Sequence, residues 1–231
     1  FGSGVGTCAQ YARAKAEHLA LKPAGVSFEH AAALPTSALA ALHGLRDAAK
    51  LKTSQKLLIN GAAGGVGTFA VQLAKSWGAE VTGVCSTKNS ALVRSLGADH
   101  VIDYSREDFT RVAQRYDVIL DNVENRSLAE CRRALAREGT LVLNSGTGAR
   151  GLRMWIRLLE PIVRAPFARQ KLRRYLSVPN HADLVELAQL VEAGVLKPVI
   201  DRICAPHETA AALGYIEGGH VCGKIVVSLR A

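Results

Sequence analysis

Four glycines in one short stretch are the residues of this sequence whose type and spacing most clearly indicate chemistry. The stretch GAAGGVG, residues 61–67, stands between an apolar run and an amphipathic stretch. Counted back from Gly67, it reads Ala62-x-Gly64-x-x-Gly67, the dinucleotide-binding fingerprint with alanine in place of its first glycine. Gly64 would let the backbone approach a pyrophosphate, and the first helical N–H groups would face that anion. The turn therefore predicts a dinucleotide site.

The strand expected after this turn ends without the acidic residue that an NAD site uses. Such an Asp or Glu, about 20 residues beyond the glycines, binds the ribose 2′-OH and repels a phosphate. The equivalent strand end here reads VCSTKNS. Ser86 can donate a hydrogen bond and Lys88 can place a positive charge beside a 2′-phosphate. The sequence therefore predicts NADP(H) as cofactor; the alternative is that both residues only cap and solubilise the next helix.

Short β-branched runs alternate with amphipathic stretches from residue 56 onward, which is typical of parallel βαβ units. Strands are expected at 56–60, 80–85, 100–103, 117–123, 139–146 and 172–178. Helices are expected at 66–77, before 96–98, and at 106–116, 127–136, 181–194 and 207–219. The alternation predicts an α/β fold, a Rossmann doubly wound parallel sheet.

The composition describes a globular chain, because 231 residues that are 48% hydrophobic can bury a substantial core. No apolar run reaches the roughly 18 residues of a membrane-spanning helix, and no signal peptide opens the chain. We therefore expect a cytoplasmic protein without a membrane partner. The five cysteines are widely separated and form no C-x-x-C pair, which indicates reduced thiols rather than disulfides or structural zinc.

The net charge of +9 raises the alternative of a nucleic-acid-binding protein. The basic residues are dispersed, however, except at 164–174, and few aromatic residues lie among them. We interpret this charge as a solvated face that attracts a phosphorylated ligand, and expect no nucleic-acid partner. Binding that falls steeply with salt would instead support the alternative.

Six stretches together carry a family resemblance: KPAGVSFEHAAALP, GAAGGVGTFAVQLAKSWGA, SLGADHVIDY, DVILDNV, LVEAGVLKPVID and GGHVCGKIVV. The chain resembles the medium-chain dehydrogenase/reductase superfamily, in its zinc-independent quinone oxidoreductase-like (zeta-crystallin-like) branch. The resemblance implies an NADPH-dependent reductase that transfers hydride to quinones or α,β-unsaturated carbonyl compounds. Residues 37–194 would form the NADP(H)-binding Rossmann domain. Residues 1–36 and 195–231 would be remnants of a GroES-like catalytic barrel, whose bulk would precede Phe1.

The resemblance also implies cofactor contacts for particular residues. The pyrophosphate would lie along Ala63, Gly64, Gly65, Val66 and Gly67, and the 2′-phosphate would meet Ser86 and Lys88. Tyr104 would sit near the adenosine end and Asn122 near the ribose. The segment of His220, Val221 and Cys222 would return to the cofactor cleft. The chain departs from the family pattern at three places: Cys222 replaces an Arg, Ala40 a frequent Thr, and Glu124 and Asn125 glycines.

The segment 34–39, LPTSAL, has no Cys or His, although zinc alcohol dehydrogenases of this superfamily supply a metal ligand near there. We therefore expect no metal, and name no catalytic residue. A zinc-type NADP-dependent alcohol dehydrogenase and a non-catalytic NADPH-binding protein remain alternatives. The expected strand at 172–178 could be an exposed edge that pairs with its copy, which predicts a homodimer.

Overall fold

The computed structural model describes residues 1–144, 169–219 and 221–229, which pack into two units. Unit 1 comprises Phe1–Ala41, Gly64–Phe69 and Ser177–Ala231, and unit 2 comprises Leu42–Ala63 and Ala70–Leu176. These two units are defined by which residues pack together, and they are not the same division as the domains expected from the family resemblance. The expected boundaries of the Rossmann domain, at residues 37 and 194, therefore stay a prediction.

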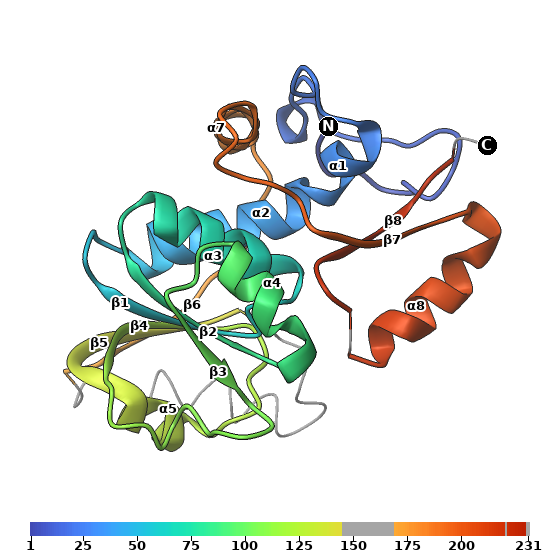
Figure 1. Cartoon of the computed structure of the whole chain (residues 1–231). Helices are drawn as coiled ribbons and strands as arrows, with labels where there is room; N and C mark the ends of the chain where they lie inside the picture. The colour runs from blue at the N-terminus through green and yellow to red at the C-terminus, as the bar shows by residue number, and fades with distance from the viewer. Residues whose placement is uncertain (145–168, 220, 230–231) are drawn as a thin grey trace, which may run out of the picture. The chain divides into compact units, whose positions relative to one another are not determined.

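Unit 2 is built on a six-stranded parallel sheet (Figure 1). Its strands lie in the order β3-β2-β1-β4-β5-β6, and each neighbouring pair is parallel. The strands are β1 (Lys56–Asn60), β2 (Glu80–Cys85), β3 (His100–Asp103), β4 (Tyr116–Asp121), β5 (Leu135–Leu143) and β6 (Lys171–Arg174). The order reverses between β1 and β4, so the predicted Rossmann doubly wound sheet is confirmed.

Helices cover both faces of this sheet, and Figure 1 shows α4 and α5 on opposite sides of it. They are the π-helical turn η2 (His43–Ala49), α3 (Gly65–Ser76), η3 (Thr87–Asn89), α4 (Ser90–Ser95) and α5 (Leu128–Ala134). Leu57, Leu58 and Ile59 on β1 are all fully buried. A central parallel strand is apolar on both faces because each face meets a layer of helices.

The helix expected at 106–116 is wrong, because turns occupy this segment. Asp108 Oδ1 accepts hydrogen bonds from the N–H of Thr110 at 2.9 Å and from its hydroxyl at 2.8 Å. A short polar side chain that binds nearby backbone N–H groups competes with the helical hydrogen-bond ladder. Tyr116, expected at the helix end, instead begins β4 and is buried.

Unit 1 contains a two-stranded parallel sheet and short helices. Its elements are η1 (Ala16–His18), α1 (Phe28–Ala33), most of α2 (Pro35–Leu42), α7 (His181–Glu192), β7 (Ile200–Cys204), η5 (Pro206–Glu208), α8 (Thr209–Glu217) and β8 (Lys224–Val227). Side chains cap two of the helices: Ser27 Oγ accepts from His30 N, and Asn180 Oδ1 from Asp183 N.

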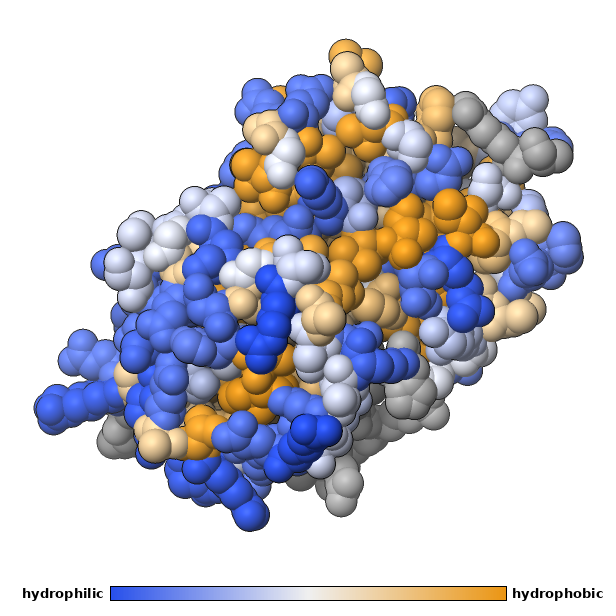
Figure 2. Space-filling view, in the orientation of Figure 1, coloured by the Kyte–Doolittle hydropathy of each residue, from blue (hydrophilic) through white to orange (hydrophobic). Residues whose placement is uncertain are grey.

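Apolar side chains are exposed on unit 1, and Figure 2 shows apolar surface among charged surface on the face in view. Tyr11 and Leu21 are about nine-tenths exposed, and Ile203 and Leu213 about half. Unit 1 therefore leaves apolar area in water that would be favourable to bury. No helix among the described residues combines the length and apolar character needed to cross a bilayer.

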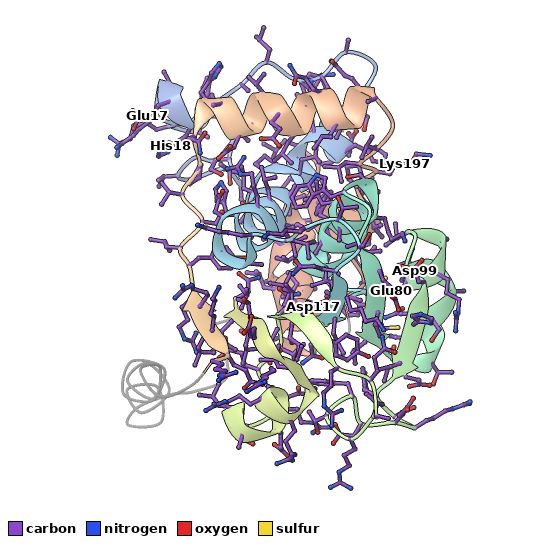
Figure 3. All side chains as sticks on the ribbon, turned by 90° about the vertical axis from the view of Figure 1, so that its left-hand side faces the viewer. Glu17, His18, Glu80, Asp99, Asp117 and Lys197 are labelled. Atoms are coloured by element: carbon purple, nitrogen blue, oxygen red, sulfur yellow. The ribbon has the colours of Figure 1, made fainter. Side chains whose placement is uncertain are left out.

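Asp99 ties together three elements at the amino-terminal edge of the sheet, where Figure 3 labels it near Glu80. Its carboxylate accepts from Lys75 Nζ at 2.8 Å and from Val81 N at 2.7 Å. Partial burial alone would raise the pKa of Asp99. The hydrogen bonds from Lys75 and Val81 outweigh burial, and the net pKa lies below its usual value.

We expect Asp99→Asn to lower the free energy of unfolding by about 1 kcal/mol at neutral pH, because about a third of this side chain is exposed. A carboxyl group with a lowered folded-state pKa stabilises above its unfolded-state pKa and loses that effect as pH falls through the folded-state value. The difference from wild type should therefore shrink as pH falls below the usual pKa of an aspartate. Urea unfolding at neutral and at acidic pH measures it, with the exposed Asp47→Asn as matched control; an equal loss in the control would contradict the role of Asp99.

Candidate cofactor site

The turn after β1 holds the glycine fingerprint in a tight conformation. Gly61 has φ 79°, and a Cβ on it would lie 2.8 Å from Val123 Cγ2, so glycine is required there. Ala62 is fully buried, and its N–H donates to Val84 O at 2.9 Å, which holds the turn on β2. Gly61 therefore supplies the tight turn, even though alanine (Ala62) stands at the position of the fingerprint's first glycine. The Asn-Gly pair at 60–61, a turn signal, could have revealed this.

The start of α3 follows directly. Gly65, Val66 and Gly67 form its first turn, and the N–H of Thr68 donates to Gly64 O at 3.0 Å. The first N–H groups of a helix have no partner within the helix and carry partial positive charge. This arrangement can bind an anion such as a pyrophosphate. Ala63, just before it, is buried with 6% exposure.

The end of unit 1 returns to this turn, because Gly64 forms a parallel bridge with Gly223. Val221 and Cys222, directly before Gly223, are half-buried. His220 lies outside the described residues. The structure thus brings the chain after Cys222 to the glycine turn, within unit 1, while cofactor contacts of these three residues stay a prediction.

The predicted 2′-phosphate residues follow β2 at the carboxyl edge of the sheet. Ser86 is half-buried and precedes η3, and Lys88 lies exposed within η3. Among the described residues, no hydrogen bond or ion pair is formed by the Lys88 ammonium. Its charge is therefore available to a ligand.

Asp103 is an acidic neighbour of these residues that the sequence analysis missed. It ends β3 opposite Cys85, and its carboxylate accepts from the hydroxyls of Thr87 and Ser105. These hydrogen bonds lower the pKa of Asp103. Arg106 Nε lies 3.5 Å from the carboxylate and offsets its charge. The parallel pairing of β2 with β3 could have revealed Asp103, because neighbouring strands end at the same edge.

Tyr104 and Asn122 differ in how firmly they are held. Tyr104 follows β3 and is 54% exposed. Asn122 follows β4; its Nδ2 donates to Asn60 O at 3.2 Å, and its Oδ1 accepts from Asn144 Nδ2 at 2.7 Å. The Asn122 side chain therefore joins the ends of β1, β4 and β5 at the reversal of strand order, where ligands of such sheets bind.

A buried carboxylate organises the same strand ends, and sequence reasoning missed it. Asp121 is 1% exposed, and its Oδ1 accepts from Asn60 Nδ2 at 2.8 Å, Val123 N at 3.1 Å and Glu124 N at 2.8 Å. A buried carboxylate needs such donors, because burying its oxygens without hydrogen bonds would lower the stability of the fold. The loop after β4 is fixed by this side chain.

Glu124 adopts a left-handed backbone conformation, with φ 55°. Glycine adopts this conformation without strain, which explains why glycine suits position 124 in the family that the chain resembles. Glu124 is 8% exposed, and its Oε2 accepts from Arg174 Nη2 at 2.9 Å. The ion pair links the loop after β4 to β6 and offsets the backbone strain.

The described residues do not supply a zinc site. None of them forms a group of three or more His, Cys, Asp or Glu side chains that could hold a metal ion. At 34–39 the side chains are apolar or hydroxyl groups, which are poor ligands for zinc.

Comparison with known proteins finds the same fold and family. The zinc-binding dehydrogenase family matches residues 96–227. The mouse mitochondrial NAD(P)H oxidoreductase RTN4IP1 is 34% identical, over 97% of this chain and 61% of its own length. The chloroplast envelope quinone oxidoreductase homolog of Arabidopsis thaliana is 32% identical, over 97% of this chain and 69% of its own length.

Among solved structures, the quinone oxidoreductase from Coxiella burnetii superimposes with a TM-score of 0.78 at 32% identity. The match covers 89% of this chain and 62% of that structure. The chain thus spans about three-fifths of the first curated relatives that it matches.

Proposed function

The chain belongs to the medium-chain dehydrogenase/reductase superfamily, in its quinone oxidoreductase-like branch. We propose that it acts as an NADPH-dependent oxidoreductase. The reaction would transfer hydride, without zinc, to quinones or α,β-unsaturated carbonyl compounds. The single observation that carries the choice of NADPH is the exposed, unpaired Lys88 at the carboxyl end of β2.

The residues of this chain would bind and orient the cofactor. When bound, NADPH supplies a hydride from C4 of its nicotinamide. The N–H groups at the start of α3 would bind the pyrophosphate, and Ser86 and Lys88 the 2′-phosphate. Tyr104 would lie near the adenosine end, and Asn122, fixed by Asn60 and Asn144, near the ribose. No catalytic residue is proposed among the described residues.

The proposed acceptors share one property, an electron-poor conjugated system that takes hydride and develops negative charge on oxygen. Aimed hydrogen-bond donors can stabilise that charge without a metal. The poor zinc ligand set of the described residues and the relatives named as quinone oxidoreductases both support this class.

A homodimer is the proposed assembly. β6 lies at the edge of the sheet in the described residues, beyond β5. The expected strand at 172–178 is confirmed in part, since β6 runs only over Lys171–Arg174. An open parallel edge presents N–H and C=O groups that a second copy can pair with.

The cytoplasm, the compartment expected from the sequence analysis, stays a proposal. The names of two relatives assign those proteins to the mitochondrion and the chloroplast envelope, so compartment varies among relatives.

Titration of this chain with NADPH and with NADH, followed by nucleotide fluorescence, tests the proposal. We expect NADPH to bind at least ~10-fold more tightly, because only NADPH carries the 2′-phosphate. Stopped assays with a quinone, an enone and a simple alcohol then separate the proposed reaction from that of a zinc-type alcohol dehydrogenase. NADPH binding without turnover of any acceptor would favour a non-catalytic NADPH-binding protein; binding of neither nucleotide would contradict the proposal.

A further inference from the structure

The end of β1 carries a chemically reactive pair of residues, Asn60 and Gly61. Asn60 is the last residue of β1 and is 3% exposed, and Gly61 follows it with φ 79°. Asparagine followed by glycine is the pair most prone to deamidation, because glycine has no Cβ to hinder its backbone nitrogen and restricts the backbone least. This is the only Asn-Gly pair in the sequence.

Deamidation is an intramolecular substitution followed by hydrolysis. The backbone nitrogen of Gly61 attacks Cγ of Asn60, so that a bond between these atoms forms while the bond from Cγ to Nδ2 breaks. Nδ2 leaves as ammonia, with the proton that the Gly61 nitrogen gives up. Water then opens the succinimide ring at one of its two carbonyl groups and leaves aspartate or isoaspartate at position 60. One water is consumed and one ammonia is released, and no oxidant or reductant takes part.

Hydrogen bonds hold the reacting amide away from this attack. Asn60 Nδ2 donates to Asp121 Oδ1 at 2.8 Å and to Asn125 Oδ1 at 3.1 Å, so both of its N–H groups have an acceptor. The main-chain oxygen of Asn60 accepts from the N–H and from Nδ2 of Asn122, each at 3.2 Å. Ring closure needs the Asn60 side chain and backbone to rotate. It therefore needs these hydrogen bonds to open first.

We propose that Asn60 is a deamidation site of this chain, and that Asp121 and Asn125 shield it in the folded state. All of these residues belong to unit 2, and the reaction needs only this chain and water, so the inference goes beyond the proposed function. The rate of deamidation then follows the fraction of molecules in which the end of β1 is open.

The product cannot rebuild the contact that protected it. A carboxylate at position 60 offers no N–H, and it would lie against the carboxylate of Asp121, which is 1% exposed. Two negative charges in one buried place repel each other. Isoaspartate would also lengthen the main chain by one carbon directly before Gly61. A single opening of this strand end can therefore leave a permanent change in the chain.

The test incubates wild type, Asn125→Ala and Asn125→Asp at mildly alkaline pH and follows deamidation of the peptide that contains Asn60 by mass spectrometry. Asn125→Ala removes one acceptor, whereas Asn125→Asp keeps a side-chain oxygen. We expect Asn125→Ala to deamidate about fivefold faster than wild type, because the loss of one hydrogen bond raises the open fraction by that factor. Asn125→Asp should stay within about twofold of wild type. Wild type unfolded in urea should react at least ~10-fold faster than folded wild type.

Asn89 is the internal reference, because it precedes Ser90 in η3 and no described hydrogen bond joins it to Asn60. Its deamidation should be the same in wild type and Asn125→Ala. Equal rates at Asn60 in these two proteins, or the same acceleration at Asn60 and Asn89, would overturn the shielding by Asn125. A folded chain that reacts as fast as the unfolded chain would overturn the shielding altogether. Absence of deamidation at Asn60 even in urea would overturn the site itself.

Discussion

Replacing Lys88 with Glu is expected to raise the dissociation constant for NADPH at least ~10-fold while leaving that for NADH within about twofold. The substitution removes a cation from the proposed 2′-phosphate site and puts there the type of residue that repels this phosphate in NAD sites. The exposed ammonium has no partner among the described residues, so its loss should cost little stability. Nucleotide fluorescence titration of each variant measures both constants.

Lys52→Glu provides the charge-matched control. Lys52 is also exposed, but it precedes β1 and so lies toward the amino-terminal edge of the sheet, away from the carboxyl ends of the strands. It should bind NADPH as wild type does, apart from a weak effect that salt removes. If both variants lost the same affinity, the effect would come from net charge alone, and the assignment of Lys88 would be wrong.

Asp121→Ala is expected to lower the free energy of unfolding by about 3–5 kcal/mol. The side chain is 1% exposed, and its removal takes one of two acceptors from Asn60 Nδ2 and leaves the N–H groups of Val123 and Glu124 without the acceptor that binds them. Glu124 would also lose a hydrogen bond that holds it in its left-handed conformation. Chemical denaturation followed by circular dichroism measures the loss.

Asp121→Asn separates the acceptor from the charge. The Asn side chain keeps an oxygen for the same three donors, so we expect a loss of only about 1–2 kcal/mol. Equal losses for Ala and Asn would show that the charge, rather than the acceptor, fixes the loop after β4. A loss below about 1 kcal/mol for Ala would contradict the network described above.

The fold could be predicted from sequence where a local pattern decides it. The β-branched run at 80–85 is a periodic signal and the glycine turn at 61–67 is a motif signal. Strand β2 has the same bounds as the run that predicted it. The segment 106–116 has helical composition, but the Asp108 side chain binds the backbone of Thr110 and ends any helix. A single side-chain hydrogen bond outweighs weak propensity there.

Reasoning from the residues alone found site residues only where they lie a short, countable distance after the glycine fingerprint. Lys88 could be found by counting from the glycines, whereas Asp103 enters the site through the pairing of β3 with β2. One of the three donors to Asp121, Asn60 Nδ2, likewise comes from a strand 61 residues earlier. Lys224 reaches Ser37 across 187 residues. Contacts of this kind depend on the folded sheet, and no local pattern encodes them.

The bridge between Gly64 and Gly223 sets an order for folding during synthesis. Its two residues are separated by about 160 positions, so it closes only after Gly223 has left the ribosome. The six strands of the sheet are complete by Arg174, well before Gly223 emerges. Domains fold as units in the order of synthesis. The sheet should therefore be assembled before Gly223 can pair with Gly64, so a nascent chain would hold the glycine turn without this bridge until Gly223 has emerged.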